Sequence, residues 1–356
     1  MFYQQAHISH WLLIVIIIAL FNFAASAEKP LFAPRVRLSD GNSIPVLGLG
    51  TSWAKQPEGE QAIKDAIDIG YRHIDTAYVY GNEKEVGNAI RTKIAEGVIK
   101  REDIFVTTKL WNTFHEPDSV AKAFQKSLDN LNITYVDLYL MHSPVSYQRI
   151  SQATNMTTQD FDNIILFPQD ANGKSLCTDI DYLGTWKAME ELVKTGKVRS
   201  LGVSNFNSQQ LDRVITAAKI KPVVNEIECH PNFNQKKFIA FAKARNVTII
   251  GYSPLGRPYA NGDRPIALKN AQVQALAAKY KKNPGQILLR YSYQNGVVVI
   301  PKSTNKERIR GNIDIFDFNL NDEDMEFMDS LNGNSRFTTI LDRDGDNKYY
   351  PFNIEF

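Results

Sequence analysis

Short runs of apolar and β-branched residues alternate along the chain with stretches whose apolar residues recur at helical spacing. The runs predict eight strands: Val46–Leu49, Arg72–Thr76, Ile104–Leu110, Tyr135–Met141, Val198–Val203, Val223–Glu228, Thr248–Tyr252 and Val297–Ile300. The stretches between them predict helices, among them Glu60–Ile69, Glu83–Ile94, Ser119–Leu131, Leu183–Lys194, Ser208–Ala218, Gln235–Arg245 and Pro284–Gln294. Before the first strand, Val36–Ile44 predicts a hairpin that turns at Asp40-Gly41.

This alternation is typical of two α/β architectures, the closed (β/α)8 barrel and the doubly wound open sheet. The count of strands reaches eight, and no G-x-G-x-x-G follows the first strand, where Gly48-Leu49-Gly50-Thr51 is the nearest match. The pattern therefore favours a single TIM barrel with an N-terminal β-hairpin. A long loop after the fourth strand, Ser143–Asp181, and the tail from Phe316 exceed simple connections. We expect both at the barrel mouth, because loops that follow barrel strands lie there.

The N-terminus carries an almost wholly apolar run, Trp11–Phe23, followed by Ala25-Ser26-Ala27. A bilayer span needs about 20 apolar residues, whereas a shorter run before small residues is typical of a secretory signal peptide. We expect a signal peptide over residues 1–27, a barrel domain over 28–356, and a secreted or secretory-lumen protein without stable membrane insertion. No Lys or Arg precedes the run, which leaves an uncleaved signal anchor as the alternative. The sequons at Asn132, Asn155 and Asn246 would then be glycosylation candidates.

Composition narrows the function class only a little. The chain is 43% hydrophobic and 22% charged with a net charge of +2, which is a globular profile without a basic surface for nucleic acid. Two cysteines, Cys177 and Cys229, are too few for a disulfide framework, although one bridge between them is possible. We expect no nucleic-acid partner, no metal ion and a monomeric chain.

Four chemically active residues stand at the ends of three consecutive predicted strands. Asp75 and Tyr80 follow the second strand, Lys109 lies near the end of the third, and His142 ends the fourth. Each residue alone has an ordinary structural interpretation, such as a solvated loop residue, a salt-bridge lysine or a core histidine. In a barrel, however, the carboxyl ends of the strands converge on one face, so these four side chains would meet.

Together the four fit a proton-donor site. An ammonium near a phenol lowers its pKa from about 10, and a carboxylate would hold Lys109 in place and charged. An imidazole can hydrogen-bond and orient a substrate oxygen, so Tyr80 would protonate an alkoxide developing from a carbonyl group. No protein side chain supplies a hydride, and a nicotinamide cofactor is therefore implied.

At this point five motifs give a specific resemblance to a family. They are GYRHIDTAYVY at Gly70–Tyr80, TKLW at Thr108–Trp111, DLYLMH at Asp137–His142, GVSNF at Gly202–Phe206 and IPKS at Ile300–Ser303. With these motifs the chain from Arg35 onward resembles the aldo-keto reductases. The resemblance implies that Tyr80 is the general acid of a catalytic tetrad with Asp75, Lys109 and His142. It also implies hydride transfer from NADPH, bound extended across the barrel mouth without a Rossmann fold.

The resemblance further implies a set of cofactor-binding residues, namely Ser204, Asn205, Glu226, Tyr252, Ser253, Leu255, Lys302, Ser303, Arg308 and Asn312. The first four match positions at the nicotinamide, the next two match diphosphate contacts, and Asn312 matches an adenine contact. Lys302, Ser303 and Arg308 match a clamp on the 2′-phosphate. Two cations and a hydroxyl suit a phosphomonoester, so NADPH is expected rather than NADH.

Three departures from the family pattern affect these expectations. Glu226 stands where the family usually has Gln, and an ionised carboxylate can accept a hydrogen bond but not donate one. Cofactor affinity or its pH dependence is therefore expected to differ. Gly311 replaces an acidic residue that often contacts adenine, and the insertion after His142 is longer than usual.

The expected reaction is reduction of aldehydes or ketones to alcohols. His142 is retained where relatives that reduce a steroid double bond have Glu, so carbonyl reduction is implied. Trp53 and Trp111, with His142, are expected to line an apolar pocket for a hydrophobic carbonyl substrate such as a ketosteroid. The alternative is a catalytically idle NADPH-binding scaffold or sensor on the same fold.

Overall fold

A computed structural model describes residues 31–54, 57–151, 163–257, 266–338 and 342–356. Eight parallel strands form its main sheet: β3 (Leu49–Gly50), β4 (His73–Asp75), β5 (Phe105–Leu110), β6 (Val136–Met141), β9 (Val198–Ser204), β10 (Val224–Glu228), β11 (Thr248–Tyr252) and β12 (Val298–Val299). Their order in space is their order in the chain. The sheet closes where Gly48 N donates to Val299 O at 2.9 Å and Val299 N donates to Val46 O at 3.0 Å. The predicted (β/α)8 barrel is confirmed.

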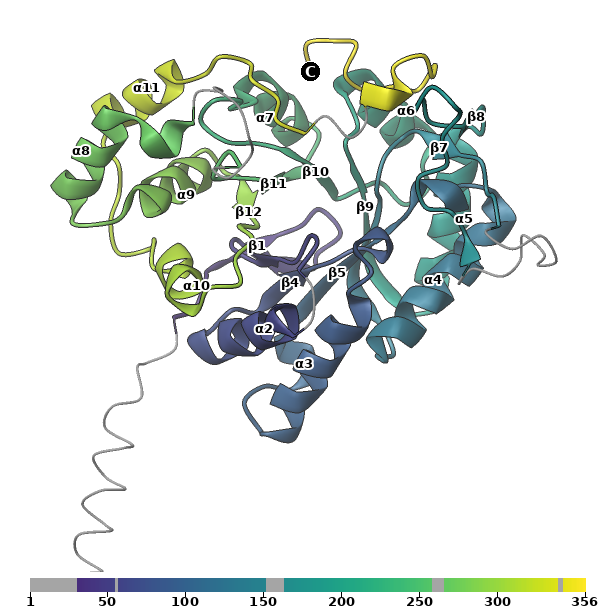
Figure 1. Ribbon diagram of the computed structural model, residues 1–356, viewed down its shortest axis with the longest axis horizontal. Helices are drawn as coiled ribbons and strands as arrows, with labels where there is room; N and C mark the ends of the chain where they lie inside the picture. Colours follow the sequence, from purple (N-terminus) through teal and green to yellow (C-terminus); the bar gives the residue numbers. More distant parts are fainter. Residues whose placement is uncertain (1–30, 55–56, 152–162, 258–265, 339–341) are drawn as a thin grey trace, which may run out of the picture.

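Helices surround the strands (Figure 1). They are α2 (Glu58–Ile69), α3 (Glu83–Ala95), α4 (Pro117–Leu131), α5 (Tyr182–Lys194), α6 (Ser208–Ala217), α7 (Lys236–Lys243), α8 (Ala271–Tyr280), α9 (Pro284–Gln294), α10 (Lys306–Ile313) and α11 (Asp322–Ser330). Each predicted helix is present within a few residues of its expected bounds. α6 and α9 begin with capping boxes at Asn207 and Asn283, which satisfy the free N–H groups of the first turn.

The predicted hairpin closes the amino-terminal end of the barrel. β1 (Arg35–Arg37) pairs with β2 (Ser43–Pro45) in an antiparallel register. Asn42 in the turn donates to Arg199 O at 3.2 Å and Ser200 Oγ at 3.0 Å, at the start of β9. Leu38 and Ile44 pack with apolar side chains of the barrel interior. Because the hairpin fills this end, only the carboxyl end of the strands remains open for a site.

The long loop after β6 and the C-terminal tail contact each other beside that open end. The loop contains a small antiparallel pair, β7 (Ser146–Tyr147) and β8 (Cys177–Thr178). The tail lies beside it and includes the 3-10 turn η6 (Asp342–Asp344) (Figure 1). Tyr147 Oη donates to Asp344 Oδ2 at 2.8 Å, and Asn347 Nδ2 donates to Thr178 O at 3.2 Å. Both cysteines are free.

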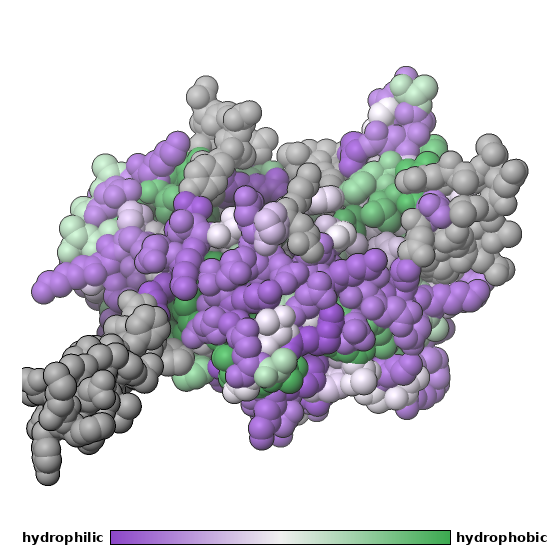
Figure 2. Space-filling view, turned by 60° about the horizontal axis from the view of Figure 1, so that its bottom comes forward, coloured by the Kyte–Doolittle hydropathy of each residue, from purple (hydrophilic) through white to green (hydrophobic). Residues whose placement is uncertain are grey.

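The expected signal peptide and the sequon at Asn155 lie outside the described residues. Within them, none of the helices has the length and apolarity that a membrane crossing requires. The sequons at Asn132 and Asn246 are on exposed residues. Figure 2 shows a face on which hydrophilic residues predominate and hydrophobic ones form small separate groups.

Candidate active site

A buried ion pair joins the ends of two neighbouring strands. Asp75 ends β4 and Lys109 lies in β5, and Lys109 Nζ is 2.6 Å from Asp75 Oδ1. The ammonium also donates to Thr76 O at 3.0 Å and lies 3.3 Å from Glu226 Oε1. Burial is the largest influence and lowers the pKa of Lys109, but its acidic neighbours, Asp75 ahead of Glu226, together outweigh burial and raise the pKa. Lys109 is therefore a firmly charged cation inside the barrel.

Tyr80 reaches this pair from a turn that follows β4. Tyr78–Tyr80 forms the 3-10 helix η1, which ends at Gly81 in the left-handed region with φ +66°. Lys109 Nζ lies 5.1 Å from the centre of the Tyr80 ring. Burial raises the pKa of Tyr80, and Lys109 lowers it as expected without cancelling the effect of burial. The phenol is therefore protonated at neutral pH and available as an acid.

His142 follows β6 and faces Tyr80. The two ring centres are 5.7 Å apart and the planes are nearly perpendicular, and Trp111 packs on the imidazole at 5.2 Å. Burial, followed by the charge of Lys109, holds the pKa of His142 well below its ordinary value. A neutral imidazole has one N–H donor and one acceptor. His142 can therefore donate a hydrogen bond to a substrate oxygen without carrying a charge.

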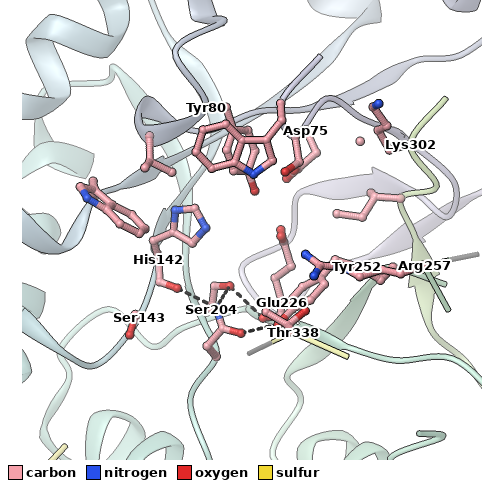
Figure 3. Close-up of a pocket in the computed structure, with 18 of the residues that line it drawn as sticks. Asp75, Tyr80, His142, Ser143, Ser204, Glu226, Tyr252, Arg257, Lys302 and Thr338 are labelled. Carbon is pink, nitrogen blue, oxygen red and sulfur yellow. Dashed lines mark hydrogen bonds between the residues drawn. The ribbon is translucent and has the colours of Figure 1, made fainter. Parts of the chain in front are cut away.

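Three of these groups line one cavity of about 170 Å³, and Lys109 lies buried behind them (Figure 3). Tyr80, Asp75 and His142 lie on one side of it, while Ser204, Glu226 and Tyr252 approach from the other strands. An aromatic wall of Trp53, Trp111 and Phe167 covers it, with ring centres 5.1 Å apart for Trp111–Phe167 and 6.4 Å for Trp53–Phe167. Trp111 Nε1 donates to Leu166 O at 2.6 Å, which ties the long loop to β5.

The residues expected at the nicotinamide form a hydrogen-bonded row. Asn205 Nδ2 donates to His142 O at 2.9 Å, and Tyr252 Oη donates to Asn205 Oδ1 at 2.8 Å. Ser204 Oγ donates to Glu226 O at 2.9 Å. These bonds fix the side chains of Ser204, Asn205 and Tyr252, at the ends of β9 and β11, along one wall of the cavity.

A second cavity of about 440 Å³ continues from the first. Its lining includes the other expected cofactor residues, namely Ser253, Leu255, Lys302, Ser303, Arg308 and Asn312. Trp53, Ser253, Arg257 and Lys302 line both cavities, so the two are continuous. Within the described part of the chain, neither Lys302 nor Arg308 has a carboxylate partner. An elongated groove with uncompensated cations along its second cavity fits a dinucleotide that carries an additional phosphate.

Four residues of this groove hold a strained backbone. Trp53, Asn205, Ser253 and Arg257 have φ between 50° and 60°, in the left-handed region that side chains other than glycine rarely adopt. Such strain is concentrated at functional sites, because the surrounding fold maintains it there.

Several residues that line the first cavity were not predicted from the sequence, among them Phe167, Thr338 and Arg257. Phe167 lies in the long loop, Thr338 lies in the tail, and Arg257 follows Gly256 in the loop after β11. The loop and tail were expected at the mouth, but nothing in their pattern singles out Phe167 or Thr338. A cation in a strand-end loop is a signal that could have identified Arg257. Across the described residues, no group of three His, Cys, Asp or Glu side chains could hold a metal ion.

Comparisons with known proteins agree with this geometry. Residues 46–333 match the model of the Aldo/keto reductase family. The human protein "Aldo-keto reductase family 1 member C2" is 44% identical over 330 residues, which cover 90% of this chain and 98% of that protein. The rabbit (Oryctolagus cuniculus) protein "Prostaglandin-E(2) 9-reductase" is 43% identical with the same coverage.

Among solved structures, an aldo-keto reductase of Bombyx mori in complex with NADP is similar to the chain. Its TM-score is 0.80 at 40% identity, and the match covers 90% of this chain and 99% of that one. The family model, the relatives and the solved structure all match nearly the same part of the chain. The chain therefore belongs to the aldo/keto reductase family and is an NADP-dependent oxidoreductase.

Proposed function

We propose that the protein reduces aldehydes or ketones to alcohols with NADPH, and that Tyr80 gives the proton. The observation that carries this proposal is the placement of Tyr80 and His142 on one cavity, with the buried Lys109–Asp75 pair next to the ring of Tyr80. When bound, the cofactor would supply the hydride that no side chain can give.

Each of the four residues has a distinct task. Neutral His142 orients the carbonyl oxygen by a hydrogen bond and adds no charge to the site. Tyr80 delivers its proton to the same oxygen, which becomes more basic as negative charge develops on it. Lys109 stabilises the phenolate left behind, and Asp75 keeps Lys109 charged and in position.

A hydrophobic ketone, with ketosteroids as the specific candidate, is the proposed substrate class. The aromatic wall of Trp53, Trp111 and Phe167 presents apolar surface to whatever occupies the cavity. A free sugar would leave many hydroxyl groups facing these rings without partners, at a cost for each. The rabbit relative is named for the reduction of a prostaglandin, which supports an apolar carbonyl compound over a sugar.

The test measures NADPH oxidation with 4-nitrobenzaldehyde and with a panel of ketosteroids. Tyr80→Phe should abolish turnover and leave NADPH binding intact. Tyr78→Phe is the matched control, because Tyr78 lies in the same 3-10 helix but does not line the cavity. A wild-type protein that binds NADPH but reduces no carbonyl in the panel would contradict the enzyme and support the idle scaffold.

For location, we propose that the chain enters the secretory pathway with residues 1–27 as a cleaved signal peptide. The support is the apolar run followed by small residues. N-terminal sequencing of native protein should start at Glu28, and glycan at the exposed Asn132 or Asn246 would agree. Cytosolic protein beginning at Met1 would contradict the location but not the chemistry.

A further inference from the structure

Lys109 has a second carboxyl neighbour besides Asp75. Glu226 reaches it from β10, with Oε1 3.3 Å from Lys109 Nζ. The side chains of Asp75 and Glu226 are 3% and 2% exposed. Their remaining oxygens, Asp75 Oδ2 and Glu226 Oε2, are buried and accept no hydrogen bond from an N–H or hydroxyl group of the described residues. Two carboxyl groups therefore share one ammonium inside the barrel.

The charges in this cluster balance only if one carboxyl group carries a proton. The other titratable groups that face Glu226 are Tyr80 from η1 and Tyr252 from β11, and burial raises the pKa of both phenols. His142 is neutral, and the cations Arg257 and Lys302 that also line the cavity are exposed and form no ion pair with Asp75 or Glu226 within the described residues. With both carboxyl groups ionised, the buried cluster would carry one uncompensated negative charge, which is costly.

Glu226 is the better candidate for the proton. Asp75 has the shorter contact with Lys109, at 2.6 Å against 3.3 Å. Burial, reinforced by the negative charge of Asp75, raises the pKa of Glu226 well above its ordinary value. Burial also raises the pKa of Asp75, but Lys109 and a hydrogen bond with Glu226 oppose that rise. The two groups therefore titrate as a pair.

We propose that Glu226 is protonated in the resting enzyme and that its ionisation makes the site prefer the oxidised over the reduced cofactor as pH rises. The proposal rests on the proposed function, since it assumes a nicotinamide cofactor in this cavity. Glu226 lines the same cavity as Ser204, Asn205 and Tyr252, the residues expected at the nicotinamide (Figure 3). It acts there as a positioning and selectivity residue and not as the proton donor of the reaction.

The selectivity follows from the charge of the ring. The oxidised nicotinamide carries a positive charge and the reduced one does not. An ionised Glu226 attracts only the positively charged oxidised ring. A protonated Glu226 has no net charge and does not distinguish the oxidised ring from the reduced ring electrostatically. Ionisation of Glu226 releases its proton to solvent through the cavity. Binding of NADP⁺ therefore favours release of this proton, and binding of NADPH favours its retention.

The experiment measures the dissociation constants of NADP⁺ and NADPH by fluorescence titration from pH 5.5 to 9.5. In the wild type, the ratio Kd(NADP⁺)/Kd(NADPH) should fall by about tenfold as pH rises, which corresponds to one pKa unit of differential interaction. Ionisation of the 2′-phosphate cancels in this ratio, because both forms carry it. In Glu226→Gln the ratio should be independent of pH.

Glu83→Gln is the matched control. Glu83 is also fully buried and burial raises its pKa, but it accepts hydrogen bonds from Thr108 and Asn130 away from the cavity. The ratio in this variant should fall as in the wild type. Calorimetry of the wild type in two buffers of different ionisation enthalpy gives a second measurement that needs no variant. It should show more proton release with NADP⁺ than with NADPH.

The outcomes separate the two proposals. A pH-independent ratio in the wild type would overturn this inference alone, and so would the same pH dependence in Glu226→Gln. Failure of both cofactor forms to bind the folded wild type would overturn the proposed function together with the inference.

Discussion

The ammonium of Lys109 lies 2.6 Å from the carboxylate of Asp75, and the lysine side chain is completely buried. Removing one partner of such a pair leaves the other charge uncompensated, which typically costs about 3–5 kcal/mol. Lys109→Met should therefore lower the free energy of unfolding by that amount and reduce kcat by about 10²–10⁴-fold. Urea denaturation and steady-state kinetics measure the two effects.

Lys93→Met is the matched control for this change. Lys93 also contacts two carboxylates, Asp68 at 2.6 Å and Glu96 at 2.7 Å, but both partners are more than 40% exposed. An exposed pair contributes about 0–1 kcal/mol. Equal losses of stability in the two variants would contradict the distinction between the buried and the exposed cluster.

Glu228 anchors the tail to the end of β10. Its buried carboxylate accepts the backbone N–H groups of Phe337 at 2.5 Å and Thr338 at 2.8 Å. In Glu228→Gln the side-chain NH₂ group would face one of these backbone N–H groups. Hydrogen exchange of the backbone amides at 337–338 should therefore be about ten- to a hundredfold faster. Hydrogen exchange with mass spectrometry measures this.

Glu190→Gln is the control, because Glu190 accepts hydrogen bonds from the backbone N–H groups of Lys219 and Ile220 far from the cavity.

The same anchor should depend on pH in the wild type. Burial is the largest influence and raises the pKa of Glu228, but hydrogen bonds from His230, Phe337 and Thr338 together bring it below the ordinary value. A lowered pKa means that the ionised form stabilises the fold. This contribution is present above about pH 4.5, the ordinary value, and is lost as pH falls through the lower folded value. A protection factor at 337–338, which is the intrinsic exchange rate divided by the observed rate at the same pH, that stays unchanged below pH 3 would contradict this.

Trp111 connects the long loop to the cavity. The hydrogen bond from Trp111 Nε1 to Leu166 O holds the segment that carries Phe167. Trp111→Phe should lower kcat/KM for a hydrophobic ketone by about tenfold, since a buried hydrogen bond contributes about 0.5–1.5 kcal/mol. Turnover of 4-nitrobenzaldehyde should change less. Trp186→Phe removes a similar bond to Ile220 O outside the site and should leave both substrates unaffected.

Substitutions of two cationic residues in the groove should change the affinities for NADPH and NADH differently. Lys302 and Arg257 both line the junction of the two cavities. Lys302 is the residue expected to bind the 2′-phosphate, whereas we expect Arg257 to lie beside the diphosphate. Lys302→Ala should weaken NADPH by about tenfold or more and leave NADH unchanged, because only NADPH has a 2′-phosphate. Arg257→Ala should weaken both by the same factor. Competitive fluorescence titration distinguishes these patterns, and an equal effect of Lys302→Ala on both cofactors would contradict the proposed clamp.

Gly202 allows close packing inside the barrel. A Cβ on Gly202 would lie 2.6 Å from a side-chain carbon of Leu140 and 2.8 Å from the carbonyl oxygen of Val224. Gly202→Ala should destabilise the protein by about 1–3 kcal/mol. Gly184→Ala in α5 is the control, because its Cβ would meet only Pro117 at 3.5 Å, and it should be neutral or stabilising by up to about 1 kcal/mol. Thermal unfolding compares the two.

Much of the barrel could be predicted from the sequence because its signals are local. The apolar runs at Ile104–Leu110 and Tyr135–Met141 match β5 and β6 to within one residue at each end, since these strands are buried on both faces. The first and last strands match less well. β3 is Leu49–Gly50 where Val46–Leu49 was predicted, and β12 is Val298–Val299 where Val297–Ile300 was predicted. These two segments pair with each other only through isolated bridges such as Leu47–Val299.

The contacts between distant residues could be predicted only in part. The topology of the barrel brings Asp75 and Lys109 together, so their pairing was predictable. The contribution of Glu226 was not, because its approach to Lys109 depends on side-chain positions across the barrel. In the same way, sequence spacing did not reveal that burial outweighs Lys109 in setting the pKa of Tyr80.

The catalytic residues lie near strand ends, whereas part of the cavity lining lies in the connecting segments, and this separation has an evolutionary consequence. The acid–base groups are fixed near strand ends by the closed barrel, whereas the loop after β6 brings Phe167 to the cavity and the tail brings Thr338, and the two segments contact each other through Tyr147 and Asp344. Substitutions in these two segments can therefore accumulate without disturbing the machinery beneath them. Substitutions in the loop and the tail can therefore change which substrate is accepted during evolution, while the catalytic residues and their reaction stay the same.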